Sequence, residues 1–199
     1  MSNIKYHTEA VVLLGFPSLE SSKTLYLLTK DFGLIIAHAR AVREHDSKLR
    51  YGLQDLSHAH VDLVAAKHGW KVVSAVPIGH FFTASCHERR AHIFPLAGRV
   101  ANLLKRLLKG EEKNELLFND VVKGFALLSS EEIAEEDAGA MEVVLVMRIL
   151  NHLGYWGDDA TLSPFLAGDV ASKEHIERIK KEKQRAILAI NKALAETQL

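Results

Sequence analysis

The sequence predicts an α+β protein, in which a small five-stranded barrel precedes a domain made only of helices. Two observations lead to this fold class. Up to residue 82, apolar and polar residues alternate in short runs, which is typical of half-buried strands. From residue 83 onward, apolar residues instead recur every three or four positions, as they do on one face of an α-helix. We therefore predict two domains, at residues 1–82 and 83–199.

Five short strands are expected in the first domain, each bounded by glycine, proline or polar residues. They comprise residues 9–15, 23–29, 33–39, 56–64 and 70–76. The turn-like sequence Lys30-Asp-Phe-Gly33 predicts one hairpin, and His68-Gly69 predicts another. Because no long helical segment interrupts the strands, the pattern favours a small barrel or sandwich, and we predict a barrel of the oligonucleotide-binding (OB) type.

Four helices are expected in the second domain. The first carries apolar residues from Ile93 to Leu108 along one face and ends at Gly110. The others are expected at residues 116–128, 131–153 and 172–195. An N-cap serine, Ser172, begins the last helix, and the acidic residues that begin the third complement the helix dipole. Residues 155–171 contain two glycines and a proline without periodicity, which predicts a connecting loop.

Composition limits the classes of function. The chain has 25 lysines and arginines and 25 aspartates and glutamates, so any affinity for nucleic acid depends on how the charges are distributed. The single cysteine, Cys86, excludes a disulfide framework and suits a reducing cytosol. No segment has the ~20 apolar residues of a membrane span, and the first residues do not read as a signal peptide. We expect a cytoplasmic protein that does not act at a membrane.

Several short motifs occur in an order and spacing that resemble a known family. They are Tyr6-His-Thr-Glu-Ala-Val-Val-Leu13, Glu20-Ser-Ser-Lys23, Leu28-Thr-Lys-Asp-Phe-Gly33, Ser47-Lys-Leu-Arg-Tyr-Gly-Leu-Gln54 and Leu150-Asn-His-Leu-Gly-Tyr155. Together they resemble the RecO family of bacterial DNA repair and recombination mediators, over much of residues 5–155. The resemblance implies an OB-fold domain packed on a helical domain. It also implies binding of single- and double-stranded DNA, strand annealing, and recombinase loading with RecR and single-strand-binding protein in the nucleoid.

The sequence departs from the family pattern at three places. Members often carry a four-cysteine zinc module after the segment that matches Leu-Gly-Tyr155, whereas residues 156–171 contain no cysteine. We therefore expect the loop at 155–171 in place of that module. Ala41 stands where the family usually has a glycine, and Asp55 stands where a proline is expected. The conformation of the loop between these two residues is therefore expected to differ.

The segment His38–Gln54, HARAVREHDSKLRYGLQ, gathers positive charge between the third and fourth expected strands. Such a loop can present several cations to a phosphate backbone, arginine can also stack on a base, and a tyrosine can offer a stacking face. The predicted DNA-binding residues of the first domain are Arg40, Arg43, Lys48, Arg50, Tyr51 and Lys23. Glu44 and Asp46 lower the charge of the segment, and a merely solvated loop is the alternative.

Cations on the first expected helix form a second candidate DNA surface, with a solvated helix face as the alternative. They are Arg89, Arg90, Arg99, Lys105 and Arg106. The resemblance also implies a groove for the C-terminal tail of single-strand-binding protein, which is acidic with an apolar end. Candidates are Val100, Leu104, Leu107 and Phe118, with Arg106 at the rim, although apolar helical stripes more often form a core.

The sequence does not indicate catalysis, a metal or a cofactor. It contains neither a Gly-x-Ser-x-Gly elbow nor a phosphate-binding Walker loop. The candidate metal ligands lack the spacing of a zinc site. They are His58, His60, Cys86, His87 and His92. We expect a non-enzymatic DNA-binding mediator. The alternatives are a protein-interaction adaptor of the same fold with little or no DNA binding, and a histidine-dependent metal hydrolase, which the scattered ligands disfavour.

Overall fold

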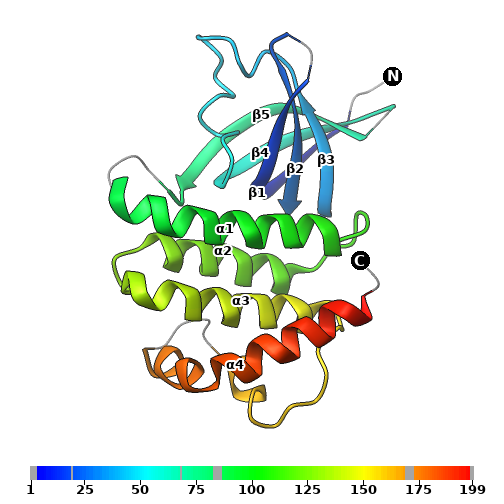
Figure 1. The fold of residues 1–199 in the computed structure, drawn as a ribbon. Coiled ribbons are helices and arrows are strands. Elements are labelled where there is room, and N and C mark those ends of the chain that lie inside the picture. Colours follow the sequence, from blue (N-terminus) through cyan, green and yellow to red (C-terminus); the bar gives the residue numbers. More distant parts are fainter. Residues whose placement is uncertain (1–3, 19, 68, 83–86, 169–172, 198–199) are drawn as a thin grey trace. The chain divides into compact units, whose positions relative to one another are not determined.

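The computed structural model describes residues 4–18, 20–67, 69–82, 87–168 and 173–197, apart from the side chains of 87–91 and 173–174. Within these residues the chain forms five strands followed by four α-helices (Figure 1). It divides into two compact units. The barrel unit comprises Met1–Ala84 and Leu108–Phe118, and the helical unit comprises Ser85–Leu107 and Asn119–Leu199. No helix in the described ranges is long and apolar enough to cross a membrane.

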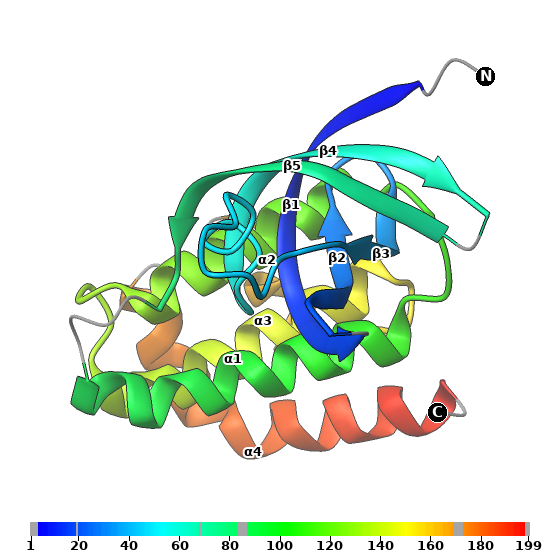
Figure 2. The ribbon, with the colours of Figure 1, turned by 90° about the horizontal axis from the view of Figure 1, so that it is seen from above.

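The strands of the barrel unit close into a barrel in the order β1-β2-β3-β5-β4. Their bounds are Lys5–Ser18 (β1), Ser22–Thr29 (β2), Gly33–Ala39 (β3), Ser57–Ala66 (β4) and Gly69–His80 (β5). Neighbouring strands are antiparallel except β3 and β5, which close the barrel in parallel where Ala37 pairs with Trp70. Figure 2 shows the strands from above. The predicted five-stranded OB barrel is confirmed, and most strands extend beyond their predicted ends.

Alternation of side chains explains the core of the barrel unit, because every second residue of a strand points inward. The inward residues Val12, Leu25, Leu27 and Ile35 are each at most 1% exposed. They share one core with residues from the loop between β3 and β4, including Val42 and Leu53. Apolar residues of this loop are therefore part of the barrel core, whereas most of its charged residues remain exposed.

The barrel unit also includes Leu108–Phe118, here called the connecting segment, which lies within the helical domain predicted at residues 83–199. Gly33 has a φ of +66°, and a methyl group at this position would overlap the backbone of Glu112. Trp70 donates a hydrogen bond from Nε1 to the carboxylate of Glu111 over 2.8 Å. The absence of a side chain on Gly33 thus allows the connecting segment to pack directly on the barrel.

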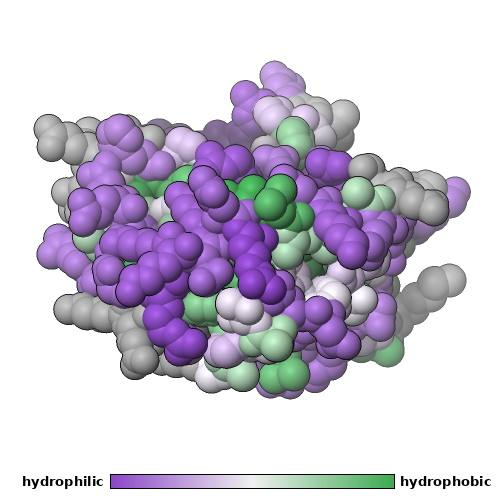
Figure 3. Space-filling model, turned by 60° about the horizontal axis from the view of Figure 1, so that its bottom comes forward, coloured by the Kyte–Doolittle hydropathy of each residue, from purple (hydrophilic) through white to green (hydrophobic). Residues whose placement is uncertain are grey.

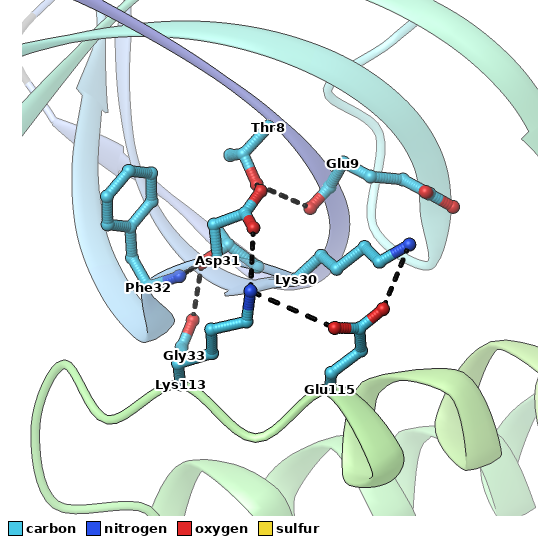
Figure 4. A network of polar contacts seen from close by, with 9 residues as sticks. Thr8, Glu9, Lys30, Asp31, Phe32, Gly33, Lys113 and Glu115 are labelled. Atoms are coloured by element: carbon cyan, nitrogen blue, oxygen red, sulfur yellow. Dashed lines mark hydrogen bonds and ion pairs between the residues drawn. The ribbon is translucent and has the colours of Figure 1, made fainter.

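Charged side chains hold the same segment (Figure 4). Asp31 accepts hydrogen bonds from Thr8 Oγ1 at 2.8 Å and from Lys113 Nζ at 3.2 Å. The hydrogen bond from Thr8, and to a lesser degree Lys113, lowers the pKa of Asp31. Lys30 lies 3.3 Å from the carboxylate of Glu115 at the start of α2. Because these charged groups are largely exposed, each ion pair adds little to the stability of the barrel unit. Several such pairs together hold the connecting segment.

The helical unit packs four helices through their apolar faces. They are α1 (His87–Leu107), α2 (Glu115–Ser129, whose first turn belongs to the barrel unit), α3 (Ala138–His152) and α4 (Lys173–Glu196). The third helix was predicted from residue 131, which is wrong: Ala134 is extended, and Glu135–Asp137 form a 3₁₀ turn before α3. The burial of Ile133 to 3% exposure draws the chain inward at this point. The predicted N-cap, Ser172, lies outside the described residues.

Two arginines fix the loop after α3. Arg148 is 6% exposed, and its Nη2 donates to the carbonyl oxygen of Gly168 over 3.1 Å. Arg185 on α4 binds both carboxylate oxygens of Asp159, at 3.0 and 3.1 Å. The loop also contains a 3₁₀ turn, Ser163–Phe165, whose Phe165 is buried. The expected connecting loop is thus held by arginine hydrogen bonds and one buried aromatic ring.

Candidate nucleic-acid interface

The loop between β3 and β4 begins and ends on strained backbone. Ala41 has a φ of +56° and Leu56 a φ of +59°, in the left-handed region that favours glycine. This conformation explains why glycine is expected at position 41 in the family pattern. Arg43 N donates to Ser21 O over 3.1 Å, and Leu56 N donates to Val12 O over 2.7 Å. These bonds fix the loop beside the β1–β2 turn, at the same end of the barrel (Figure 1).

Three predicted DNA-binding residues meet at this end. Lys23, Arg43 and Arg50 line one hollow of about 260 Å³, together with Val42 and Gln54. We call this the cation hollow. Lys23 comes from β2 and the two arginines from the loop, so the fold brings together charges that lie up to 27 positions apart in the sequence. Three converging cations create the positive potential that a phosphate group requires.

The other predicted residues of this loop are exposed but do not line the cation hollow. Arg40 and Lys48 are solvated, and the side chain of Tyr51 is 67% exposed. The two carboxylates of the loop, Glu44 and Asp46, are also exposed. They are therefore placed to lower the potential of the loop in solution, but they do not line the cation hollow.

One carboxylate lies beside the cation hollow. Asp55 approaches Lys23 to 3.9 Å and accepts a hydrogen bond from the backbone of Gly15. Burial raises the pKa of Asp55, and this effect is opposed by the Lys23 ammonium and by a hydrogen bond from the Gly15 backbone. An ionised Asp55 neutralises part of the charge that Lys23 brings, so it weakens the attraction of the hollow for anions.

The outside of β1, β2 and β3 carries an aromatic face that was not predicted from the sequence. Phe16 lies opposite Thr24, and Leu14 opposite Tyr26. The rings of Phe16 and Tyr26 meet edge to face with centroids 6.0 Å apart. On β3, Ile36 continues this face opposite Tyr26. The period-two alternation of the strands would have revealed the face, because the residues between these positions are the inward ones.

The candidate cations of α1 belong to the helical unit and have different surroundings. Arg99 binds Glu142 through Nε and Nη2 at 2.8 and 2.7 Å, and the hydrogen bond from Arg99 to that carboxylate raises the pKa of Arg99. Lys105 is half-buried, and Arg106 is exposed. Arg89 and Arg90 lie in α1, but their side chains are outside the described residues. Arg99 is thus already engaged with an acidic partner.

A groove between α1, α3 and α4 has a volume of about 710 Å³. Apolar side chains such as Leu103, Val146 and Ile187 line it, and the basic residues Arg99, Arg106 and Lys183 accompany them. We call this the helical groove. The face of the molecule in Figure 3 is mainly hydrophilic, with small apolar areas between polar side chains.

The structure does not bring the predicted peptide-groove residues into one place. Val100 and Arg106 line the helical groove. Leu104 and Leu107 are at most 3% exposed, inside the helical unit. Phe118 is 1% exposed and belongs to the barrel unit. The groove is lined by α1 together with α3 and α4, and the sequence pattern could not relate these two helices to α1.

Two of the candidate metal ligands, His58 and His60, contact other side chains of the barrel unit. His58 Nε2 lies 2.6 Å from Glu9, and burial lowers the pKa of His58 although this carboxylate acts in the opposite direction. The ring of His60 stacks on that of His7. Cys86 is outside the described residues, as is the side chain of His87. Within the described part of the chain, no three histidine, cysteine, aspartate or glutamate side chains converge as metal ligands.

Comparison with known proteins adds independent information. Residues 1–79 match the family described as the N-terminal domain of recombination protein O. The chain is 32% identical over 150 residues to the DNA repair protein RecO of Heliobacterium modesticaldum, across 75% of this chain and 52% of that protein. It is 26% identical over 113 residues to the DNA repair protein RecO of Thermodesulfovibrio yellowstonii, across 57% of this chain and 45% of that protein. The chain spans about half the length of the curated relatives it matches.

Proposed function

We propose that this chain, which is a RecO-family protein by its N-terminal domain, is a DNA-binding mediator of recombination and repair that acts without covalent chemistry. The main support is the cation hollow, in which Lys23, Arg43 and Arg50 converge at one end of the barrel. Phosphate binding there would neutralise backbone charge, lower the repulsion between two strands and favour their annealing. By the same family relation, RecR and recombinase loading are part of the proposal.

Salt dependence of DNA binding tests this function. The variant Arg43→Ala/Arg50→Ala removes two cations that line the hollow. We expect weaker binding of a fluorescent single strand, and a salt slope shallower by about 0.7 for each lost phosphate contact, about 1.4 in total. Asp55→Asn should act in the opposite direction, since it removes the carboxylate 3.9 Å from Lys23.

Lys5→Ala/Lys67→Ala is the matched control, because both lysines are exposed residues of the barrel unit that do not line the hollow. This variant removes the same amount of positive charge, but the salt dependence of its DNA binding should have the same slope as that of the wild-type protein. Equal slopes for the two double variants would show that only net charge matters. Failure of the wild-type protein to bind even at low salt would favour the adaptor of the same fold.

The helical groove supports a second element of the proposal, the binding of the C-terminal tail of single-strand-binding protein. An acidic peptide with an apolar end fits a groove whose apolar residues are accompanied by Arg106 and Lys183. Arg106→Glu should weaken binding of a labelled tail peptide more than fivefold, since it replaces attraction by repulsion (~1 kcal/mol or more). Lys123→Glu on α2 is the control for net charge, because Lys123 is exposed and does not line the groove. Equal loss in both variants would contradict this site.

A further inference from the structure

We infer that Asp55 regulates the cation hollow as a proton-linked competitor, a carboxylate within the chain that opposes the binding of DNA phosphate at Lys23. This inference rests on the proposed function and specifies how its site is regulated. Asp55 Oδ1 lies 3.9 Å from Lys23 Nζ, and Lys23 lines the hollow with Arg43 and Arg50. The Lys23 side chain is 24% exposed and that of Asp55 41%, so DNA can reach the pair from solvent.

The fold holds the Asp55 carboxylate at this place. It accepts a hydrogen bond from the backbone of Gly15 on β1. Gly15 leaves room for this contact, because a methyl group there would lie 3.0 Å from Asp55 Oδ1. The next residue, Leu56, is fixed by the hydrogen bond of 2.7 Å from its N–H to Val12 O. Asp55 therefore stays beside Lys23 when an anion enters the hollow.

The competing charge is a feature of this chain and not of the family pattern. Asp55 stands where that pattern has a proline, which carries no charge. A phosphate that binds Lys23 must share the ammonium with the carboxylate, and like charges close together repel each other. The hollow thus attracts DNA less strongly than its three cations would alone.

A bound phosphate shifts the proton equilibrium of Asp55. In the free protein, burial raises the pKa of Asp55, while the Lys23 ammonium and the hydrogen bond from Gly15 oppose this rise. A phosphate at Lys23 offsets the field of the ammonium and adds a second anion beside the carboxylate, so it raises the pKa further. A carboxylate that is held in place can then lose its charge by taking up a proton from solvent.

The sign of the pH dependence follows from this proton uptake. The complex binds more protons than the free protein, so DNA binding strengthens as the pH falls. The gain begins near the pKa of Asp55 in the complex and is complete below its pKa in the free protein. Because burial raises the latter, the window lies above the usual pKa of an aspartate.

The charged groups around the carboxylate are cations that keep their charge in the acidic range. They are Lys23 on β2, which faces Asp55, and Arg43 and Arg50, which line the same hollow. On the side of β1 the carboxylate meets the backbone of Gly15. The exposed His38 and His45 gain charge as the pH falls, but they do so equally with and without a carboxylate at position 55.

Binding of fluorescent oligo-dT to the full chain, between about pH 7.5 and about pH 5, tests the coupling. Thymine is suitable because it takes up no proton in this range. At the upper pH, Asp55→Asn should bind about two- to fivefold more tightly than wild type, which is what a partly exposed charge contributes. The ratio of the two affinities should approach one as the pH falls, because a protonated Asp55 is neutral like asparagine.

Glu44→Gln is the matched control, because it removes an equal charge from an exposed position of the same loop that does not line the hollow. Its effect should be smaller, and it should keep the pH dependence of the wild type. Lys23→Ala provides a second background, in which Asp55→Asn should have much less effect because the shared ammonium is gone. An undiminished effect there would show that Asp55 acts through the shape of the loop, and would overturn the competition.

The outcomes separate this inference from the proposed function. Equal oligo-dT affinity of wild type and Asp55→Asn at the upper pH would overturn the competitor but leave the DNA-binding function intact. So would an effect that Glu44→Gln reproduces. A ratio that stays constant as the pH falls would overturn the link to proton uptake. Absence of oligo-dT binding by both proteins, even at low salt, would instead remove the proposed function.

Discussion

Asp120→Asn is expected to destabilise the helical unit by about 3–5 kcal/mol, because it leaves a buried arginine without its counter-charge. Asp120 is 7% exposed and Arg148 is 6% exposed. The carboxylate accepts from Arg148 Nε at 2.8 Å and Nη2 at 3.0 Å, and it lies 2.6 Å from His152 Nε2. The amide of asparagine is similar in shape but neutral. Chemical denaturation followed by far-UV circular dichroism, which reports mainly on helices, measures the change.

The helical unit offers a matched control with the same geometry and different burial. Glu142 binds Arg99 through two hydrogen bonds of 2.7 and 2.8 Å, but the Arg99 side chain is 60% exposed. Glu142→Gln should therefore cost no more than about 1 kcal/mol. If the two variants were equally destabilised, burial would not be the reason for the large effect at Asp120.

Replacing both partners tests the physical cause further. In Asp120→Leu/Arg148→Met, both members of the buried arginine–carboxylate pair are replaced, so Arg148 is no longer left as an unpaired charge and we expect most of the lost stability to return. The carbonyl oxygen of Gly168, which accepts from Arg148, is in an exposed residue and can bind water instead. A double variant that is less stable than Asp120→Asn would mean that Arg148 stabilises mainly by holding the loop after α3.

The local sequence pattern predicted the strands and most of the helices. Buried residues recur at every second position in a strand and at every third or fourth position in a helix, so the pattern of apolar residues reveals both. It failed where distant residues decide the structure. The acidic run from Glu131 has the composition of a helix start, yet the buried Ile133 and the extended Ala134 delay α3 until Ala138. The attachment of Leu108–Phe118 to the barrel depends on Gly33, which carries no local sign of such a contact.

The candidate site was predictable only where its residues lie close together in the sequence. The cations of the β3–β4 loop stand together in the sequence, and the family motif indicated Lys23. Their convergence in one hollow depends on the hydrogen bond from Arg43 to Ser21, which no local pattern indicates. Likewise, the pairing of Arg99 with Glu142 joins two helices, so Arg99 already has an acidic partner that the sequence did not indicate. Sequence reasoning thus identifies charged residues well and their partners poorly.

Gly33→Ala is the second change with a large expected effect, and it acts on the barrel unit. Alanine at a φ of +66° costs roughly 1–2 kcal/mol of backbone strain. Its methyl group would also overlap the backbone of Glu112, so either the connecting segment or β3 must move. Overpacking of this kind typically adds about 1–3 kcal/mol. We therefore expect a total loss of about 2–5 kcal/mol in the unfolding free energy of the barrel unit.

Gly154→Ala separates the two contributions, because Gly154 has a φ of +74° but nothing within 4 Å of an added methyl group. It should show the backbone cost alone.

The two tryptophans of the chain allow the two units to be followed separately, because Trp70 lies in the barrel unit and Trp156 in the helical unit. In a Trp156→Phe background, Trp70 fluorescence reports the unfolding of the barrel unit for Gly33→Ala, and circular dichroism follows Gly154→Ala. Equal losses for the two glycines would mean that backbone strain alone accounts for Gly33, and that the connecting segment does not require a glycine there. A larger loss at Gly33 would show that close contact with the connecting segment stabilises the barrel on which the cation hollow is built.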